Sequence, residues 1–181
     1  GAGFIVSLDA DGQHPPELIP ALLEQARPET LVFGSRAKDA AGIPIARLRA
    51  NRTANFFISW ASGRWIEDTQ CGMRVYPSGL FDRIRLRRER RSGFVFESEV
   101  LIEACRAGLQ VAPVPIPALY EQVLQRPSHL RPFFDISAIV IMVTLKILAR
   151  GFYIQGLLRS QSERRRRLRE RTCIRTSDAA L

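Results

Sequence analysis

The sequence predicts an α/β fold, because short apolar runs alternate with longer segments of helical periodicity along the chain. Phe4–Leu8 is the first such run, and the Asp and Gly that follow are typical of the end of a buried strand. Ile45–Ser62 has the length of a long helix, and Gly63 stands where a glycine often ends one. This alternation favours helices packed on a largely parallel sheet.

The other elements follow in the same order. A helix begins at Pro16, since proline suits the first helical turn. Three prolines in the stretch Val111–Leu119 confine that strand to an edge of the sheet, because proline lacks the N–H that a central strand needs. The remaining predicted elements are strands at Leu31–Gly34, Met73–Tyr76 and Phe94–Phe96, a short helical segment at Pro77–Ile84, and helices at Glu97–Ala107, before Gly108, and at Asp135–Arg150.

The charge of the chain is concentrated in two places. The 181 residues carry 27 basic and 18 acidic side chains, a net charge of +9. Residues 83–91 contain six arginines and one acid, and the last nineteen residues contain seven arginines and three acids, so the remainder is neutral. Neither run has interleaved aromatic residues that could stack on bases, which argues against a nucleic-acid partner.

Cysteine content and hydropathy indicate the compartment. The three cysteines are far apart and form no CxxC pair, which is typical of reduced thiols in the cytoplasm. The longest apolar segment, Ile136–Ala149, is interrupted by polar residues and falls short of the about 20 residues of a membrane span.

The segment DADGQHPP directly after the first strand carries the strongest chemical signal. Asp9 and Asp11 stand two residues apart at the carboxyl end of a strand, where open α/β sheets bind their ligands. Two converging carboxylates repel each other unless a cation lies between them, and oxygen ligands select Mg²⁺ or Mn²⁺. The alternative is a turn in which both side chains only cap backbone amides.

Several motifs together resemble family 2 glycosyltransferases, and bacterial polyprenyl-phosphate sugar synthases in particular. In chain order they are DADGQHPPEL, GSR, ANRTANFF, DTQCGMRVYP, FVFESEVLIEACRAG, VPIPALY and RPSHLRPFFD, over about residues 3–135. The resemblance implies a GT-A fold, a Rossmann-like α/β sandwich. The nucleotide-binding motifs that precede these in the family, a VVIPAYNE strand and a DDGS turn, are not in the sequence. The resemblance therefore implies that this is the C-terminal portion of the domain, and we expect it alone to be poorly soluble and inactive.

By resemblance, the first motifs hold the donor. Asp9 and Asp11 match the metal-binding pair of the family, and Gln13 matches a glutamine beside that metal. Arg36 in GSR matches an arginine that faces phosphate, for which a guanidinium is well suited. A surface salt bridge is the alternative role for Arg36.

The later motifs imply residues that handle the acceptor. Asp68 in DTQCG and Glu97 in FESE are the candidate catalytic residues, and Glu97 matches an acidic base of many members. A favourable charge at a helix N-terminus is its alternative role. Ser128, His129 and Arg131 in RPSHLRP match a loop that contacts phosphates, although the family more often has Ser-Lys than Ser-His.

The C-terminal segment predicts contact with a membrane surface. We expect residues 1–132 to form the partial GT-A domain, 133–160 an amphipathic, interfacial helical segment, and 161–181 a disordered basic tail. The chain would then lie at the inner face of the membrane, on its cytoplasmic side. A helix packed on the sheet is the alternative for the apolar segment.

These expectations combine into a functional hypothesis. The chain would move a sugar from a nucleotide-sugar donor to a lipid or polyprenyl-phosphate acceptor with the help of Mg²⁺ or Mn²⁺. The alternatives are transfer to another lipid hydroxyl, or a membrane-binding fragment without catalysis.

Overall fold

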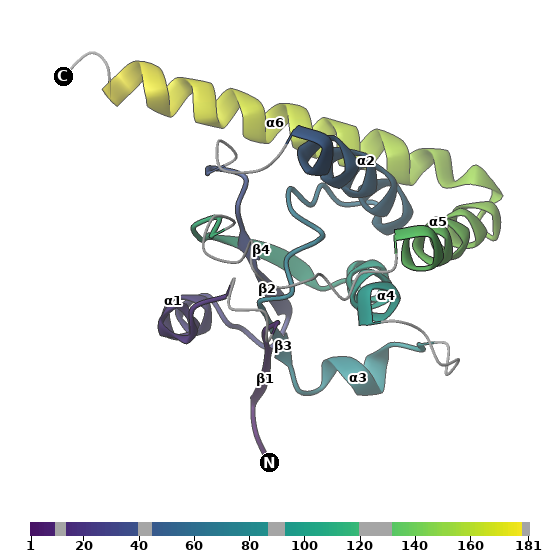
Figure 1. The fold of residues 1–181 in the computed structure, drawn as a ribbon, viewed down its shortest axis with the longest axis horizontal. Helices are drawn as coiled ribbons and strands as arrows, with labels where there is room; N and C mark the ends of the chain where they lie inside the picture. The colour runs from purple at the N-terminus through teal and green to yellow at the C-terminus, as the bar shows by residue number, and fades with distance from the viewer. Residues whose placement is uncertain (10–13, 40–44, 87–92, 120–131, 179–181) are drawn as a thin grey trace.

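A computed structural model of the chain describes residues 1–9, 14–39, 45–86, 93–119 and 132–178. Its centre is a sheet of four strands in the spatial order β1-β3-β2-β4, with helices on both faces (Figure 1). The strands are β1 (Phe4–Ser7), β2 (Thr30–Ser35), β3 (Arg74–Pro77) and β4 (Gln110–Pro115). The α/β class predicted from the sequence is confirmed.

The directions of the strands differ from the prediction of a largely parallel sheet. Only β2 and β4 are parallel, whereas β3 is antiparallel to both β1 and β2. The cause lies in the segment before β3, which returns the chain to the edge where β2 ends. Arg74 at the start of β3 is therefore the register partner of Ser7 in β1 and of Phe33 in β2.

One edge of the sheet consequently gathers several chain segments. The carboxyl ends of β1, β2 and β4 lie there together with the amino end of β3. Hydrogen bonds continue the contacts past the strands: Gly34 N–H donates to the Met73 carbonyl at 2.9 Å, and Ile116 N–H donates to the Ser35 carbonyl at 3.0 Å. Residues that follow β1, precede β3 or follow β2 are thereby brought close together.

The helices cover the two faces of the sheet unequally. They are η1 (Pro16–Leu18), α1 (Ile19–Glu24), α2 (Ile45–Ser62), α3 (Leu80–Arg83), α4 (Gly93–Arg106), α5 (Pro132–Leu148), η4 (Gly151–Tyr153) and α6 (Ile154–Asp178). Alternate residues of β2 face opposite sides: Leu31 and Phe33 pack in the core with α4, and Val32 packs with Leu22 of α1. A third core joins α2, α4 and α5.

Two predicted segments are helical instead. Phe94–Phe96, predicted as a strand, forms the first turn of α4, where Val95 and Ile102 share the core beside α2 and α5. The basic tail, predicted to be disordered from residue 161, continues as α6 to Asp178. Arginine is a good helix former, and α6 packs along α2 (Figure 1).

β1 also differs from the prediction, because it is an edge strand rather than a buried one. Ile5 is 44% exposed and Leu8 39%. β4 occupies the opposite edge, as its prolines predict.

The apolar C-terminal region makes a sharp bend. Within the described ranges, no single helix combines the length and apolarity needed to cross a bilayer. The segments Ala138–Leu148 and Gly151–Glu170 satisfy the criteria only as a pair, and they are bent by 102° relative to each other.

Candidate functional site

Asp9 lies where β1 ends, with its carboxylate directly over Gly72. A Cβ atom added at Gly72 would come 2.4 Å from both carboxylate oxygens, so only glycine leaves room for this position. Asp9 N–H donates to His14 Nδ1 at 3.2 Å, and His14 Nδ1 lies 3.5 Å from Asp9 Oδ2. The Asp9 side chain is 40% exposed, so its carboxylate remains accessible.

His14 and Cys71 form the packed floor behind Asp9. His14 is 4% exposed, and its Nε2 lies 3.5 Å from Cys71 Sγ. Burial raises the pKa of the Cys71 thiol to about 11, and the Asp68 charge adds to this rise. Cys71 is therefore a neutral packing residue at physiological pH, because burial keeps its thiol protonated.

Arg74 ties the loop before β3 to the start of α4. Its side chain is fully buried and donates to three backbone carbonyls, those of Cys71 at 2.8 Å, Thr69 at 2.9 Å and Glu97 at 2.7 Å. The same guanidinium lies 3.6 Å from the Glu97 carboxylate. One buried cation thus fixes two segments that lie 23 residues apart.

Glu97 lies near the start of α4, where Arg74 pairs with its carboxylate. Burial raises the pKa of Glu97; the Arg74 charge opposes this rise, and the negative charge of Asp9 adds to it. The negative charge of Asp9 therefore acts on Glu97, although the two residues belong to segments far apart in sequence. An accessible carboxylate such as that of Asp9 is an oxygen ligand of the kind that a hard cation prefers.

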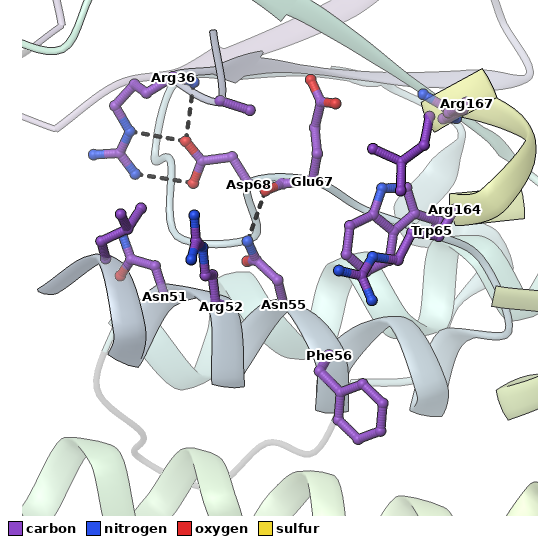
Figure 2. Close-up of a pocket in the computed structure, with 13 residues that line it drawn as sticks. Arg36, Asn51, Arg52, Asn55, Phe56, Trp65, Glu67, Asp68, Arg164 and Arg167 are labelled. Carbon is purple, nitrogen blue, oxygen red and sulfur yellow. Dashed lines mark hydrogen bonds and ion pairs between the residues drawn. The ribbon is translucent and has the colours of Figure 1, made fainter. Parts of the chain in front are cut away.

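Arg36 and Asp68 form a second unit, a buried bidentate pair (Figure 2). Arg36 Nε donates to Asp68 Oδ2 at 2.8 Å, Nη2 donates to Oδ1 at 3.0 Å, and the Arg36 backbone N–H also donates to Oδ2 at 3.1 Å. Burial raises the pKa of Asp68, but the hydrogen bonds and charge of Arg36 outweigh this and hold it below its ordinary value. Asp68 is therefore an ionised partner of Arg36 at neutral pH.

The loop that carries Asp68 is clamped by α2. Asn55 donates to the Glu67 carbonyl at 2.6 Å and accepts from the Thr69 N–H and hydroxyl at 2.9 and 2.7 Å. Ser35 donates to the Glu67 carboxylate at 2.6 Å. Each of these bonds comes from Ser35 on β2 or Asn55 on α2, and neither residue is a sequence neighbour of the loop. The shape of the loop therefore depends on β2 and α2.

A pocket of about 460 Å³ opens between this loop, α2 and α6 (Figure 2). The guanidinium of Arg164 lies 5.1 Å from the centre of the Trp65 ring, a cation–π contact that joins α6 to the loop. Four arginines from three parts of the chain line the pocket, which makes it suitable for an anion. Its walls are formed by Arg36, Ala37, Leu48, Asn51, Arg52, Asn55, Phe56, Trp65, Glu67, Asp68, Arg164, Arg167 and Leu168.

The predicted site residues thus fall into three groups. Asp9 lies over Gly72 and Glu97 pairs with Arg74, while Arg36 and Asp68 pair with each other beside the pocket. The third group, Asp11, Gln13, Ser128, His129 and Arg131, lies outside the described residues. Within the described part of the chain, no cluster of three or more His, Cys, Asp or Glu residues could hold a metal ion.

Sequence reasoning missed Arg74 and Asn55. A lone arginine inside the apolar run GMRVY was a usable signal, because a strand buries such a residue only when it has partners. Asn55 carried no comparable signal, since a polar residue on a helix is usually exposed.

Comparison with known proteins identifies relatives of one kind. No family model matches the sequence. The chain is 31% identical to the undecaprenyl-phosphate mannosyltransferase of Micrococcus luteus over 124 residues, which cover 64% of this chain and 49% of that protein. It is 31% identical to the polyprenol monophosphomannose synthase of Mycolicibacterium smegmatis over 120 residues, 64% of this chain and 45% of that one.

A more distant relative extends the match. The UDP-N-acetylglucosamine–dolichyl-phosphate N-acetylglucosaminyltransferase of Methanococcus voltae is 27% identical over 155 residues, 80% of this chain and 60% of that protein. The chain spans about half the length of the first two relatives. The mixed sheet with helices on both faces fits a GT-A-like fold. The chain is therefore similar to proteins that are named as polyprenyl-phosphate and dolichyl-phosphate sugar transferases or synthases.

Proposed function

We propose that the protein transfers a sugar from a nucleotide-sugar donor to a polyprenyl-phosphate acceptor. The names of its relatives support this class of reaction, because each name combines a sugar with the phosphate of a polyprenyl or dolichyl lipid. The observation that carries the proposal is the accessible carboxylate of Asp9, which lies just past β1 at the edge of the sheet where the carboxyl ends of β1, β2 and β4 meet. This edge is where α/β folds of this kind bind ligands.

The proposal includes a divalent cation, Mg²⁺ or Mn²⁺, held by Asp9 together with Asp11 and Gln13. The accessible carboxylate of Asp9 and the effect of its negative charge on Glu97 support a cation at this place. Such an ion, when bound, neutralises the charge that grows on the departing nucleotide diphosphate. The residues of the chain orient the donor by holding its diphosphate oxygens against this edge.

Glu97 is a positioning residue in this proposal. A lipid phosphate is already ionised at neutral pH and needs no general base, whereas a hydroxyl acceptor would need one. Glu97 instead stays paired with Arg74 at 3.6 Å and keeps the start of α4 against the loop that carries Asp68.

We place the acceptor phosphate in the arginine-lined pocket beside the Arg36–Asp68 pair. Asp68 fixes the guanidinium of Arg36 at the pocket wall, and Arg52 comes from α2. Arg164 and Arg167 approach from α6 on the other side (Figure 2). Guanidinium groups from several directions match the oxygens of a phosphate. Ser128, His129 and Arg131 would complete these contacts.

A lipid acceptor also requires access to a membrane, and we propose that the chain lies peripherally at the inner face of the bilayer. Exposed apolar residues of α5 and α6 support this orientation, and α6 adds a dense series of arginines that would attract anionic lipid. The exposed apolar residues are Val140, Ile141, Leu145, Leu148, Phe152, Ile154, Leu158 and Leu168.

The test compares Asp9→Asn with Asp82→Asn, which removes an exposed carboxylate on α3. Membranes from cells that express the protein from its own gene are supplied with nucleotide sugars, polyprenyl phosphate and increasing Mn²⁺. We expect Asp9→Asn to lower transfer at least about 100-fold while Asp82→Asn leaves it unchanged. Full activity of Asp9→Asn, or activity that persists in excess chelator, would contradict the metal role.

A further inference from the structure

A second pocket of about 460 Å³ lies away from the proposed donor and acceptor sites, at the corner where α5 turns into α6. Figure 1 shows this corner at the end of the long helix opposite to the C-terminus. The ends of α2 and α4 form the other walls. The lining residues are Ser62, Gly63, Arg64, Cys105, Arg106, Gly108, Arg150, Tyr153, Arg159, Ser162 and Glu163.

The corner is held in an unusual backbone conformation. Gly151, Phe152 and Tyr153 have φ angles of 59°, 62° and 40°, so three successive residues are left-handed. Phe152 and Tyr153 are strained in this region, which L side chains rarely adopt. The indole N–H of Trp60 holds the turn by donating to the carbonyls of Phe152 at 3.0 Å and Tyr153 at 3.1 Å.

Two glycines make room for the Tyr153 ring. A Cβ at Gly63 would come 2.7 Å from the Tyr153 hydroxyl, and a Cβ at Gly156 would come 2.1 Å from its ring. With Tyr153 packed inward, the neighbouring Phe152 and Ile154 point outward and are 60% and 62% exposed. Leu158 is one turn further along α6 on the same face and is 64% exposed.

The pocket has a positive charge that its own acids do not balance. It contains four arginines, from α4, from the end of α5, from α6 and from the loop after α2, and one acid, Glu163. Glu163 pairs with Arg64 at 3.4 Å. Arg106 binds Glu103 and the carbonyls of Ala61 and Lys146.

Arg106 and Arg150 repel each other in this pocket. Burial lowers the pKa of Arg106, Glu103 opposes this, and the charge of Arg150 lowers it further. Arg150 itself lies 4.1 Å from the centre of the Tyr153 ring, which directs its guanidinium to the pocket rim. An anion between these arginines would relieve their repulsion.

We propose that this pocket binds the phosphate headgroup of an anionic membrane lipid, while Phe152, Ile154 and Leu158 enter the adjoining bilayer interface. The inference rests on the proposed membrane association but not on sugar transfer. A lipid rather than a free phosphate is the occupant, because the exposed apolar side chains flank the arginines Arg150 and Arg159 in sequence. An apolar surface beside a basic pocket matches the two parts of a phospholipid.

The test measures binding of the chain to vesicles of phosphatidylcholine that contain phosphatidic acid. The double variant Arg150→Gln/Arg159→Gln removes two pocket arginines. The matched control Arg49→Gln/Arg85→Gln removes the same charge from exposed positions outside α6 that line neither pocket. We expect the pocket variant to bind the vesicles about 30-fold more weakly than the wild type, because the loss of each arginine weakens binding by about tenfold or less. Vesicle binding by the control variant should change by less than about threefold.

A second variant tests the apolar part without disturbing the turn. Asn tolerates left-handed backbone, so Phe152→Asn keeps the corner while removing the exposed ring. We expect it to weaken binding to every vesicle and to leave the preference for phosphatidic acid unchanged.

The outcomes separate the two proposals. A wild-type chain that binds no vesicle would overturn both the headgroup site and the proposed membrane association. Binding that is lost equally in the pocket and control variants would overturn the headgroup site alone. Equally strong binding of soluble glycerol phosphate at Arg150 and Arg159 would overturn the choice of a lipid.

Discussion

Gly72 and Asp9 illustrate how one residue determines the position of another 63 positions away in sequence. Gly72 does not have a left-handed φ angle. Glycine is required there because a side chain would occupy the space of the Asp9 carboxylate. We therefore expect Gly72→Ala to displace the Asp9 carboxylate and to lower metal-dependent transfer about 100-fold, because misplacement by an ångström can have that effect. Melting should shift little.

The control for this change is Gly79→Ala. A Cβ at Gly79 meets nothing within 4 Å, so this variant should transfer sugar like the wild type. Equal activity of the two alanine variants would show that Asp9 does not need its observed position.

Arg74 is the residue with the largest expected contribution to stability. Arg74→Met would leave three carbonyls without their hydrogen-bond donor and the Glu97 carboxylate without its counter-charge. We expect the free energy of unfolding to fall by about 3–5 kcal/mol, as when one partner of a buried pair is removed. Urea unfolding measures this.

Arg83→Met provides the comparison. Arg83 pairs with Glu29 at 2.7 Å, but both side chains are largely exposed, so we expect a loss of no more than about 1 kcal/mol. A loss of that same size for Arg74→Met would contradict the role of Arg74 as a buried tie.

At the scale of elements, the Arg36–Asp68 pair joins β2 to the loop before β3. The pKa of Asp68 is lower in the folded chain than in the unfolded one, so the pair stabilises the fold above the ordinary carboxyl pKa of about 3.9. This stabilisation is lost as the pH falls through the folded-state pKa. We expect the stability difference between wild type and Asp68→Asn to be large at neutral pH and to shrink progressively below about pH 4.

Unfolding by urea at several pH values checks this sign. A difference between the two proteins that stays constant between neutral pH and about pH 3, or grows on acidification, would mean that Asp68 is not an ionised partner of Arg36.

The contact between α4 and α5 also depends on a buried charge. Lys146 Nζ lies 3.0 Å from Glu99 Oε1 without the geometry of a hydrogen bond, and it donates to Glu103 at 2.5 Å. We expect Lys146→Met to reduce the free energy of unfolding by about 3–5 kcal/mol, because Glu99 is 1% exposed and would lose its counter-charge.

Adding Glu99→Gln should restore part of that loss in urea unfolding. Arg166→Met is the control, since its pair with Glu170 is exposed and 3.9 Å long, and it should change stability by less than about 0.5 kcal/mol. If Lys146→Met behaves like this control, the charges do not hold α5 on α4.

At the scale of the whole molecule, sequence patterns predicted the features that depend on neighbouring residues, such as the ends of helices. The span Ile45–Ser62 was predicted with both ends correct, and Gly63 and Gly108 end their helices with φ angles of 75° and 91°. The direction of β3 could not be predicted, because it depends on where the preceding segment returns in space. Phe94–Phe96 has strand-forming residues, but burial of Val95 against α2 and α5 favours the helix.

For the candidate site, too, the sequence indicated individual residues but not the contacts between distant segments. The resemblance proposed Asp9, Arg36, Asp68 and Glu97 as site residues, yet it did not reveal that Arg36 and Asp68 bind each other. The apolar run around Arg74 could have indicated a buried arginine, but its partner Glu97 could not be predicted, because the Glu97 carbonyl lies 23 residues away in sequence.

The central claim is that the molecule glycosylates a lipid phosphate. The most direct measurement is transfer of labelled sugar, in membranes from cells that express the protein from its own gene, to polyprenyl phosphate and to the matching polyprenol. The arginine-lined pocket predicts a sugar-phosphate lipid from the first acceptor and no product from the second. Equal labelling of the free polyprenol, or no product with any nucleotide sugar, would contradict the account.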